Sequence, residues 1–208
     1  MQDSYACLTL GEIRSVLDKL GGEYGARRFL RGELSVSEQT YRWSKDDDGI
    51  VYFTVVSNGL SGKQWFDRLQ ANHVRIYSPT KRILLSSHFV KTDGEIYKVA
   101  VLPGELFLDG RRTTPHIFAE AESRGLIKPN VEIACYIREF FPYDEIDAIG
   151  LQNIITMHEP IRADSGAGSF LGTRNDRSTK ANFLFSYTDK INEDWYVGTG
   201  FAFVSKVS

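Results

Sequence analysis

The sequence predicts an α+β protein in which helices come first and short antiparallel strands are concentrated toward the C-terminal end. Apolar residues with helical spacing recur through the first two-thirds of the chain, whereas short strand-like segments follow from residue 149 onward. The 208 residues are 42% hydrophobic and 25% charged, a composition typical of an ordered globular domain. The sequence contains no internal repeat and no low-complexity tract that would indicate a solenoid or a disordered chain.

Residues 1–45 are predicted to form a helical segment that precedes the main domain of residues 46–208. Thr9 and Glu12 have the spacing of a capping box, and apolar residues follow them at helical intervals. Gly21-Gly22 predicts a break, so we expect two short helices here rather than one long helix.

The middle of the chain alternates between strand and helix signals. Residues 41–44 and 50–56 are predicted strands on either side of an Asp48-Gly49 turn. Nearly all residues of the second strand are β-branched or aromatic, which predicts a central strand that is buried on both faces. Residues 96–108 predict one or two further strands. Capping residues and prolines predict four helices, which begin near Ser61, Ser78, Thr113 and Val131.

The charge balance and the apolar pattern argue against several functional classes. Lys and Arg number 25 and Asp and Glu number 27, so the net charge is −2 and no nucleic-acid binding is expected. No apolar run of about 18 residues is present, which predicts no membrane insertion. The first residues lack the basic and apolar regions of a secretory signal. A cytoplasmic location is therefore the default expectation, while the actual localisation stays open.

Catalytic and metal-binding patterns are not found in the sequence. His158-Glu159 begins like a zinc site, but no second His or Cys pair follows at ligand spacing, and Gly-x-Ser-x-Gly is absent. We therefore expect no enzymatic activity, no bound calcium or zinc and no cofactor. Two alternatives remain open: an enzyme of unknown chemistry that uses His158 and Glu159, and a structural or virion module.

The C-terminal segment of residues 173–199 has an unusual composition. Fourteen of its 27 residues are Asn, Asp, Ser, Thr or Tyr, and aromatic residues are interleaved with them. This vocabulary is typical of antibody paratopes, in which aromatic rings supply contact area and short polar side chains supply adaptable hydrogen bonds. The segment ends in Gly-Phe-Ala-Phe-Val at residues 200–204, which predicts a buried strand.

These features resemble the variable proteins of diversity-generating retroelements, a family with a C-type-lectin fold. The resemblance lies in the Gly-Phe-Ala-Phe-Val ending, in Trp195 before it, and in the polar-aromatic stretch. It implies a C-type-lectin-like domain over residues 46–208, with a ligand-binding region at about residues 173–199. In that family, reverse transcription randomises adenines of a template repeat, and the resulting surface recognises a ligand. Here the expected partner is a protein or another macromolecule.

The chain lacks the sugar-binding motifs of calcium-dependent lectins. Those lectins use Glu-Pro-Asn and Trp-Asn-Asp, where this chain has Glu159-Pro160-Ile161 and Asp194-Trp195-Tyr196. Calcium-dependent sugar binding is therefore not expected. The resemblance also implies that residues 51–56 and 201–204 share one sheet, since the two ends of a lectin-like domain meet.

Alternation of strand side chains predicts which residues form the binding surface. Phe183 and Trp195 are expected to be anchored inward or at the rim of the surface, and Leu184 is placed in the core on the assumption of a bulge. One exposed patch is predicted to contain Asn182, Phe185, Tyr187, Thr188, Asn192, Asp194, Tyr196 and Thr199. Replacing Phe185, Tyr187 and Tyr196 together by Ser is then expected to leave the melting temperature nearly unchanged and to abolish partner binding.

Overall fold

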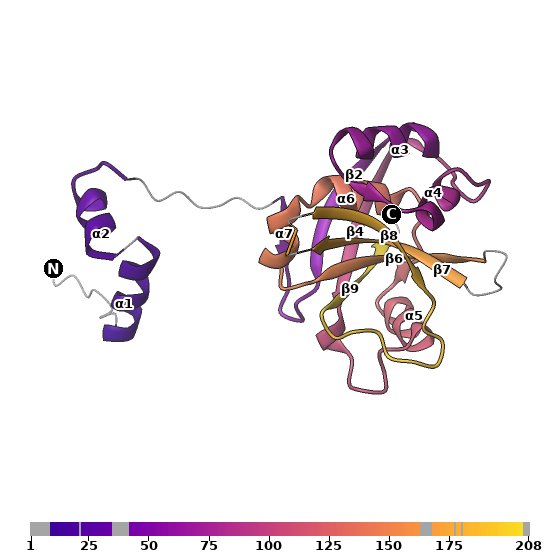
Figure 1. The fold of residues 1–208 in the computed structure, drawn as a ribbon. Coiled ribbons are helices and arrows are strands. Elements are labelled where there is room, and N and C mark those ends of the chain that lie inside the picture. Colours follow the sequence, from indigo (N-terminus) through magenta and orange to yellow (C-terminus); the bar gives the residue numbers. More distant parts are fainter. Residues whose placement is uncertain are drawn as a thin grey trace. The chain divides into compact units, whose positions relative to one another are not determined.

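The computed structural model describes residues 9–20, 22–34, 42–162, 168–176, 178–179 and 181–205. The chain divides into two compact units, Met1–Tyr41 and Arg42–Ser208 (Figure 1). The described residues form seven α-helices, a short 3-10 helix and one nine-stranded sheet, so the predicted α+β class is confirmed. Within these residues, the helices are all too short or too polar to cross a membrane.

The first unit contains the two helices that the sequence predicts, α1 (Leu10–Lys19) and α2 (Gly22–Leu30). The Thr9 backbone N–H donates to the Glu12 carboxylate at 2.7 Å, and the Glu12 N–H donates to the Thr9 hydroxyl at 3.3 Å. This reciprocal pair is the predicted capping box. Gly22 has a φ of 74°, a left-handed conformation that interrupts the helix, while Gly21 lies outside the described residues.

The second unit is organised around a mixed sheet with the strand order β1-β2-β4-β9-β6-β7-β8-β3, and β5 also pairs with β9. The strands are β1 (Trp43–Lys45), β2 (Val51–Asn58), β3 (Arg75–Ile76), β4 (Asp93–Pro103), β5 (Leu126–Ile127), β6 (Asn153–Arg162), β7 (Gly168–Asp176), β8 (Ala181–Thr188) and β9 (Thr199–Ser205). The expectation of antiparallel strands alone is wrong, because β6 runs parallel to β9 and β3 runs parallel to β8. After the β7–β8 hairpin, the chain crosses back and lays β9 beside β6 in the same direction.

Strand β2 lies in the same sheet as β9, as predicted, with β4 between them. The prediction that this strand is buried on both faces is wrong. Its residues alternate between buried and exposed, and Tyr52 and Val56 are 38% and 56% exposed. The physical reason is position: β2 lies near an edge of the sheet, and the apolar cluster on this face is centred on β4, β6 and β9.

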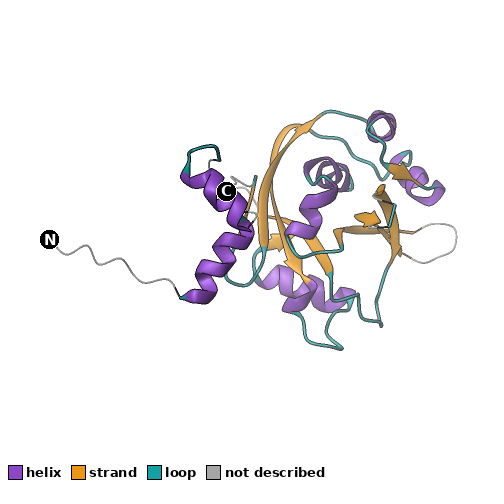
Figure 2. Cartoon of the chain, turned by 60° about the vertical axis from the view of Figure 1, so that its left-hand side comes forward, coloured by secondary structure: helices purple, strands orange, loops and turns teal. Residues whose placement is uncertain are grey.

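Helices cover both faces of the sheet (Figure 2). One face packs against α3 (Gly62–Ala71), α4 (Ser78–Leu84), α6 (Ile133–Phe140) and α7 (Tyr143–Ala148), and the other against α5 (Thr114–Ser123) and the 3-10 helix Gly104–Leu106. On the first face, Phe53 of β2 stacks on Phe140 at 4.5 Å between ring centroids. On the second, Phe118 of α5 meets Phe203 of β9 at 6.0 Å.

Helix starts agree closely with the predictions. Ser61 and Gln64 form a complete capping box at the start of α3, and Pro79 and Pro115 stand in the first turns of α4 and α5. Helix α7 is the exception, because its acidic sequence resembles a solvated connection more than a packed helix. Its Ile146 is nevertheless fully buried in the apolar cluster on this face of the sheet.

Candidate ligand-binding surface

Arginine and aromatic side chains meet on one face of the sheet where β3, β8 and β7 lie side by side. Arg75 pairs with Phe183, Phe183 pairs with Arg174, and Arg174 pairs with Asn153 of β6. Residues directly opposite one another on paired strands project to the same face. The four side chains therefore form a row across the sheet, and the Arg75 guanidinium carbon lies 5.6 Å from the centroid of the Phe183 ring.

A chain of aromatic contacts runs along β8 from this row. Tyr77 stacks on Phe183 and meets the edge of Phe185, with centroid distances of 5.8 Å in both pairs. Phe185 then contacts Tyr187 at 5.4 Å, and Tyr187 contacts the buried Trp195 at 6.4 Å. The aromatic chain thus begins at a half-exposed tyrosine and ends in the core.

Two hollows lie over this part of the sheet. The smaller, about 210 Å³, is lined by Tyr77, Arg174, Asp176, Phe183 and Phe185. The larger, about 390 Å³, is lined by Asp147, Gln152, Asn153, Arg174, Asn175, Asp176 and Tyr196. Arg174 and Asp176 line both, so the hollows adjoin. We call the residues of the two hollows together the β7–β8 surface.

Two glycines make room for tyrosine rings at this surface. A Cβ on Gly172 would stand 2.6 Å from the Ile154 carbonyl oxygen and 3.0 Å from the Tyr187 ring. A Cβ on Gly198 would stand 2.8 Å from the Tyr196 ring. Each ring therefore lies directly over a backbone that lacks a side chain. Tyr196 is held further by Gln152, whose side-chain amide donates to the tyrosine hydroxyl at 3.3 Å.

Four of the eight predicted patch residues are placed as expected or nearly so. Phe185 lines the smaller hollow and Tyr196 the larger. Thr188 and Asn192 are exposed but line neither hollow. Phe183 and Trp195 point inward as predicted, with 8% and 5% of their surface exposed.

Tyr187 departs from the prediction because it is half-buried against the cluster around Trp195. Burial raises the pKa of its hydroxyl, and the Arg174 charge and the Asn153 side chain offset this only in part. Asn153 lies close enough to affect the pKa, yet neither its amide oxygen nor the Tyr187 hydroxyl has a partner within hydrogen-bond geometry. The triple replacement of Phe185, Tyr187 and Tyr196 by Ser is therefore expected to lower the melting temperature, because it removes the Tyr187 ring from this cluster.

Three further predictions about the patch are wrong. Asn182 is half-buried and projects to the opposite face from Phe183, since neighbouring strand residues alternate. Thr199 is only 1% exposed, because β9 lies in the middle of the sheet. Asp194 is a structural anchor: its carboxylate accepts the backbone N–H of Gly110 at 2.6 Å and that of Arg112 at 3.1 Å.

Leu184 is fully buried, as predicted, but not for the predicted reason. The β7–β8 register runs without interruption from Ser169–Thr188 to Asp176–Ala181, so no bulge occurs between them. Leu184 and Phe183 are both buried because side chains cover the sheet on both faces at this point. Neither face of β8 is solvent-exposed at these two residues, so the expected bulge is not needed to bury Leu184.

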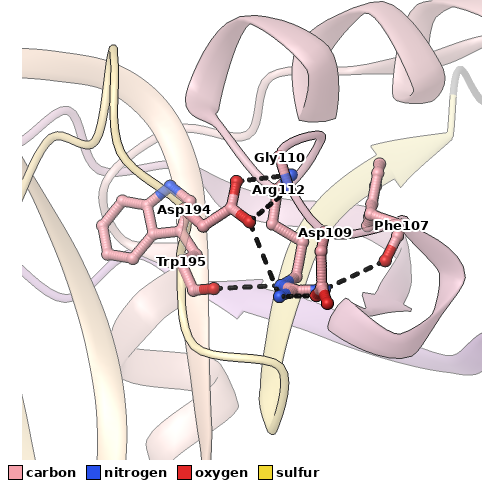
Figure 3. Close-up of polar contacts among 6 residues, drawn as sticks. All are labelled: Phe107, Asp109, Gly110, Arg112, Asp194 and Trp195. Atoms are coloured by element: carbon pink, nitrogen blue, oxygen red, sulfur yellow. Dashed lines mark hydrogen bonds and ion pairs between the residues drawn. The ribbon is translucent and has the colours of Figure 1, made fainter.

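Arg112 is not marked by any sequence pattern, yet it holds the loop next to the surface (Figure 3). Its buried guanidinium donates to the carbonyl oxygens of Trp195 and Phe107, both at 3.1 Å, and to the Asp109 carboxylate at 2.5 Å. Asp194 lies 3.6 Å from the same guanidinium. No residue near Arg112 in the sequence predicts that it is buried or paired, and Asp194 is 82 residues away along the chain.

Thr114 at the start of α5 ties a second part of the same loop. Its hydroxyl donates to the Asp189 carboxylate at 2.6 Å and accepts the indole N–H of Trp195 at 3.1 Å. Its backbone N–H donates to the Lys190 carbonyl at 2.9 Å. Together with Arg112, Thr114 fixes both ends of the segment that leads from β8 to Tyr196.

His158 occupies a closed environment. Its Nδ1–H donates to the Glu159 carbonyl at 2.7 Å, and its Nε2 accepts the backbone N–H of Leu171 at 2.9 Å. The Glu159 side chain points elsewhere and pairs with Lys128 at 2.6 Å. Both ring nitrogens are therefore engaged with backbone, and neither is presented to a substrate. Across the described ranges, no cluster of three His, Cys, Asp or Glu could hold a metal ion.

The buried His158 is expected to make the fold acid-sensitive. Burial lowers the pKa of His158 to about 4 in the folded protein. Between about pH 6.5 and pH 4 this imidazole is therefore protonated in the unfolded chain but stays neutral in the folded one. Stability contributed by the neutral ring is present above this window and is lost as the pH falls through it. The expected loss between about pH 7 and about pH 5 is about 2 kcal/mol, measurable from urea midpoints.

The comparison that isolates this effect uses two histidine variants. His158→Gln can keep one acceptor and one donor but cannot titrate, so its stability is expected to fall less on acidification. His88→Gln removes an exposed histidine and is expected to retain the wild-type slope. Equal slopes for all three proteins would contradict the assignment.

Comparison of the chain with protein-family models, curated proteins and solved structures finds no match. The fold and the site therefore define the protein only as an α+β domain with a mixed nine-stranded sheet. They also define a fixed aromatic and polar surface beside one end of that sheet.

Proposed function

We propose that this protein is a ligand-binding protein of the diversity-generating-retroelement type, with a C-type-lectin-like domain that recognises a partner macromolecule through the β7–β8 surface. One observation carries the proposal. The polar-aromatic segment of residues 173–199 divides into exposed side chains at or beside two hollows and buried anchors behind them. Binding loops are mounted in this way, with adaptable contacts on a rigid support.

The anchors explain how the segment tolerates exchange at its surface. Trp195, Asp194 and Thr199 are tied into the core or to Arg112, whereas Arg174, Thr188 and Tyr196 are exposed. Substitutions at exposed positions usually change stability by no more than about 0.5 kcal/mol. The arrangement therefore suits a protein whose surface changes while its fold is maintained.

The lectin-like fold is supported by the meeting of the two ends of the domain. Strand β2 near the start of the second unit and strand β9 at its end share one sheet, as the resemblance implies. The alternative of an enzyme built on His158 and Glu159 has no supporting observation, since both imidazole nitrogens are engaged with backbone. For a purely structural module, the two hollows lined by exposed aromatics would have no role.

Sequencing of the genomic locus tests the proposal directly. We expect a near-copy of the codons for residues 173–199 downstream of the gene, together with a reverse-transcriptase gene. Among natural variants, codons should differ at exposed positions such as Arg174, Thr188 and Tyr196. They should agree at Trp195 and Leu184, where a change would open a cavity. A locus without either element, or variation concentrated at the buried positions, would overturn the proposal.

A further inference from the structure

Arg174 lines the smaller hollow, and Arg75 lies beside it over the ring of Phe183. Arg75 and Arg174 flank Phe183 on either side and are both exposed. Neither forms an ion pair with any Asp or Glu in the part of the chain that the structure describes, whereas Arg42, Arg68, Arg112 and Arg124 do. A guanidinium offers planar, paired donors that match a carboxylate.

Asp176 lines the same hollow but its carboxylate is directed to its own turn. It accepts hydrogen bonds from the hydroxyl of Ser178 at 2.7 Å and from that of Thr179 at 2.9 Å. These bonds lower the pKa of Asp176 to about 2, so it stays ionised. The site is therefore mixed in charge, and Asp147 in the adjoining hollow adds a second negative group. An extended polyanion would be repelled here, whereas a single carboxylate fits.

The hollow has the size of one side chain. Its volume of about 210 Å³ is below the usual range for drug-sized ligands, about 300–1,000 Å³. Tyr77 and Phe185 wall it with aromatic carbon, against which the methylene groups of an acidic side chain can pack. Tyrosine and arginine are also the residues that most often dominate protein–protein binding energy.

We infer that the β7–β8 surface recognises a partner protein through an acidic side chain, which enters the smaller hollow and pairs with Arg174, while the charge of Arg75 beside Phe183 adds to the attraction. This inference rests on the proposed function of the surface and names the chemistry of its ligand. The walls Tyr77, Phe183 and Phe185 contact the apolar part of that side chain and its neighbours.

A displayed library of random linear peptides, selected on the immobilised full chain, provides the probe. We expect the selected peptides to be enriched in Asp and Glu. Changing the selected acidic residue of a synthetic peptide to Gln or Asn should weaken binding about tenfold, the effect of losing one charge-assisted contact. The Arg174→Glu variant should weaken the acidic peptide similarly and should prefer the same peptide with Lys in that place. Phe185→Ser should weaken both versions of the peptide.

Arg82→Glu is the matched control, because Arg82 is an exposed arginine of α4 that lines neither hollow. It should bind the acidic peptide like the wild type. Equal binding of the Glu and Gln peptides, or equal losses in Arg174→Glu and Arg82→Glu, would overturn the inference. The inference would also be overturned if the selected peptides bound Arg174→Glu as well as the wild type but no longer bound Phe185→Ser. The locus test would still decide the proposed function separately.

Discussion

Replacing Arg112 by Met is expected to lower the free energy of unfolding by about 3 kcal/mol or more. Methionine keeps much of the length of the side chain but cannot donate to the carbonyl oxygens of Trp195 and Phe107. It also leaves Asp194 without the only positive charge paired with it among the described residues. Buried acceptors that lose their donor cost more than the hydrogen bond itself contributed. Urea unfolding followed by tryptophan fluorescence measures the loss.

The neighbouring Arg111 provides the control for this prediction. Arg111 is exposed, and its backbone N–H donates to the Leu108 carbonyl whatever the side chain. Arg111→Met should therefore unfold within about 0.5 kcal/mol of the wild type. If both methionine variants were equally stable, Arg112 would not be the anchor of the loop.

Replacing Trp195 by Ala is expected to cost about 3–5 kcal/mol. The indole is 5% exposed and meets the rings of Phe170 and Phe201 at centroid distances of 6.3 and 6.2 Å. Its removal leaves a cavity behind Tyr187 and frees the Thr114 hydroxyl from its indole donor. Thermal unfolding by circular dichroism gives the change in stability, and loss of peptide binding reports the collapse of the surface.

Two variants separate packing from surface effects in this experiment. Trp195→Phe keeps an aromatic ring but lacks the indole N–H. Besides the cost of its smaller volume, it should lose about 1 kcal/mol of stability for the missing hydrogen bond to Thr114. Phe185→Ser removes a ring that is less buried than Trp195 and should lower stability by clearly less than Trp195→Ala. A Trp195→Ala protein as stable as Phe185→Ser would show that Trp195 is not part of the core.

The elements of this fold could be predicted where their signals are local. The capping box of Thr9–Glu12 involves residues three positions apart and forms as predicted, and Ser61 caps its helix as predicted. Burial of Trp195 and of the Phe201 strand also follows from residue type alone, because a large apolar surface must leave water. The paratope-like composition of residues 173–199 likewise indicated the segment in which the hollows are found.

The roles of single residues within that segment depended on strand pairing. Asp194 and Thr199 have the same side-chain chemistry as exposed ligand-binding residues, yet Arg112 engages the first and the central position of β9 buries the second. The row of Arg75, Phe183 and Arg174 likewise exists only because β3 and β7 lie on either side of β8.

The sequence by itself therefore determined the α+β class, the starts of the helices other than α7, the buried strand β9 and the segment that carries the surface. Each of these depends on periodicity, capping or composition within a few neighbouring residues. Only the tertiary structure decided the mixed sheet order, the anchoring of the loop by Arg112 and the placement of Arg75 and Arg174 on either side of Phe183. These features join residues distant along the chain, and a contact of this kind is set by which strands pair and in which register.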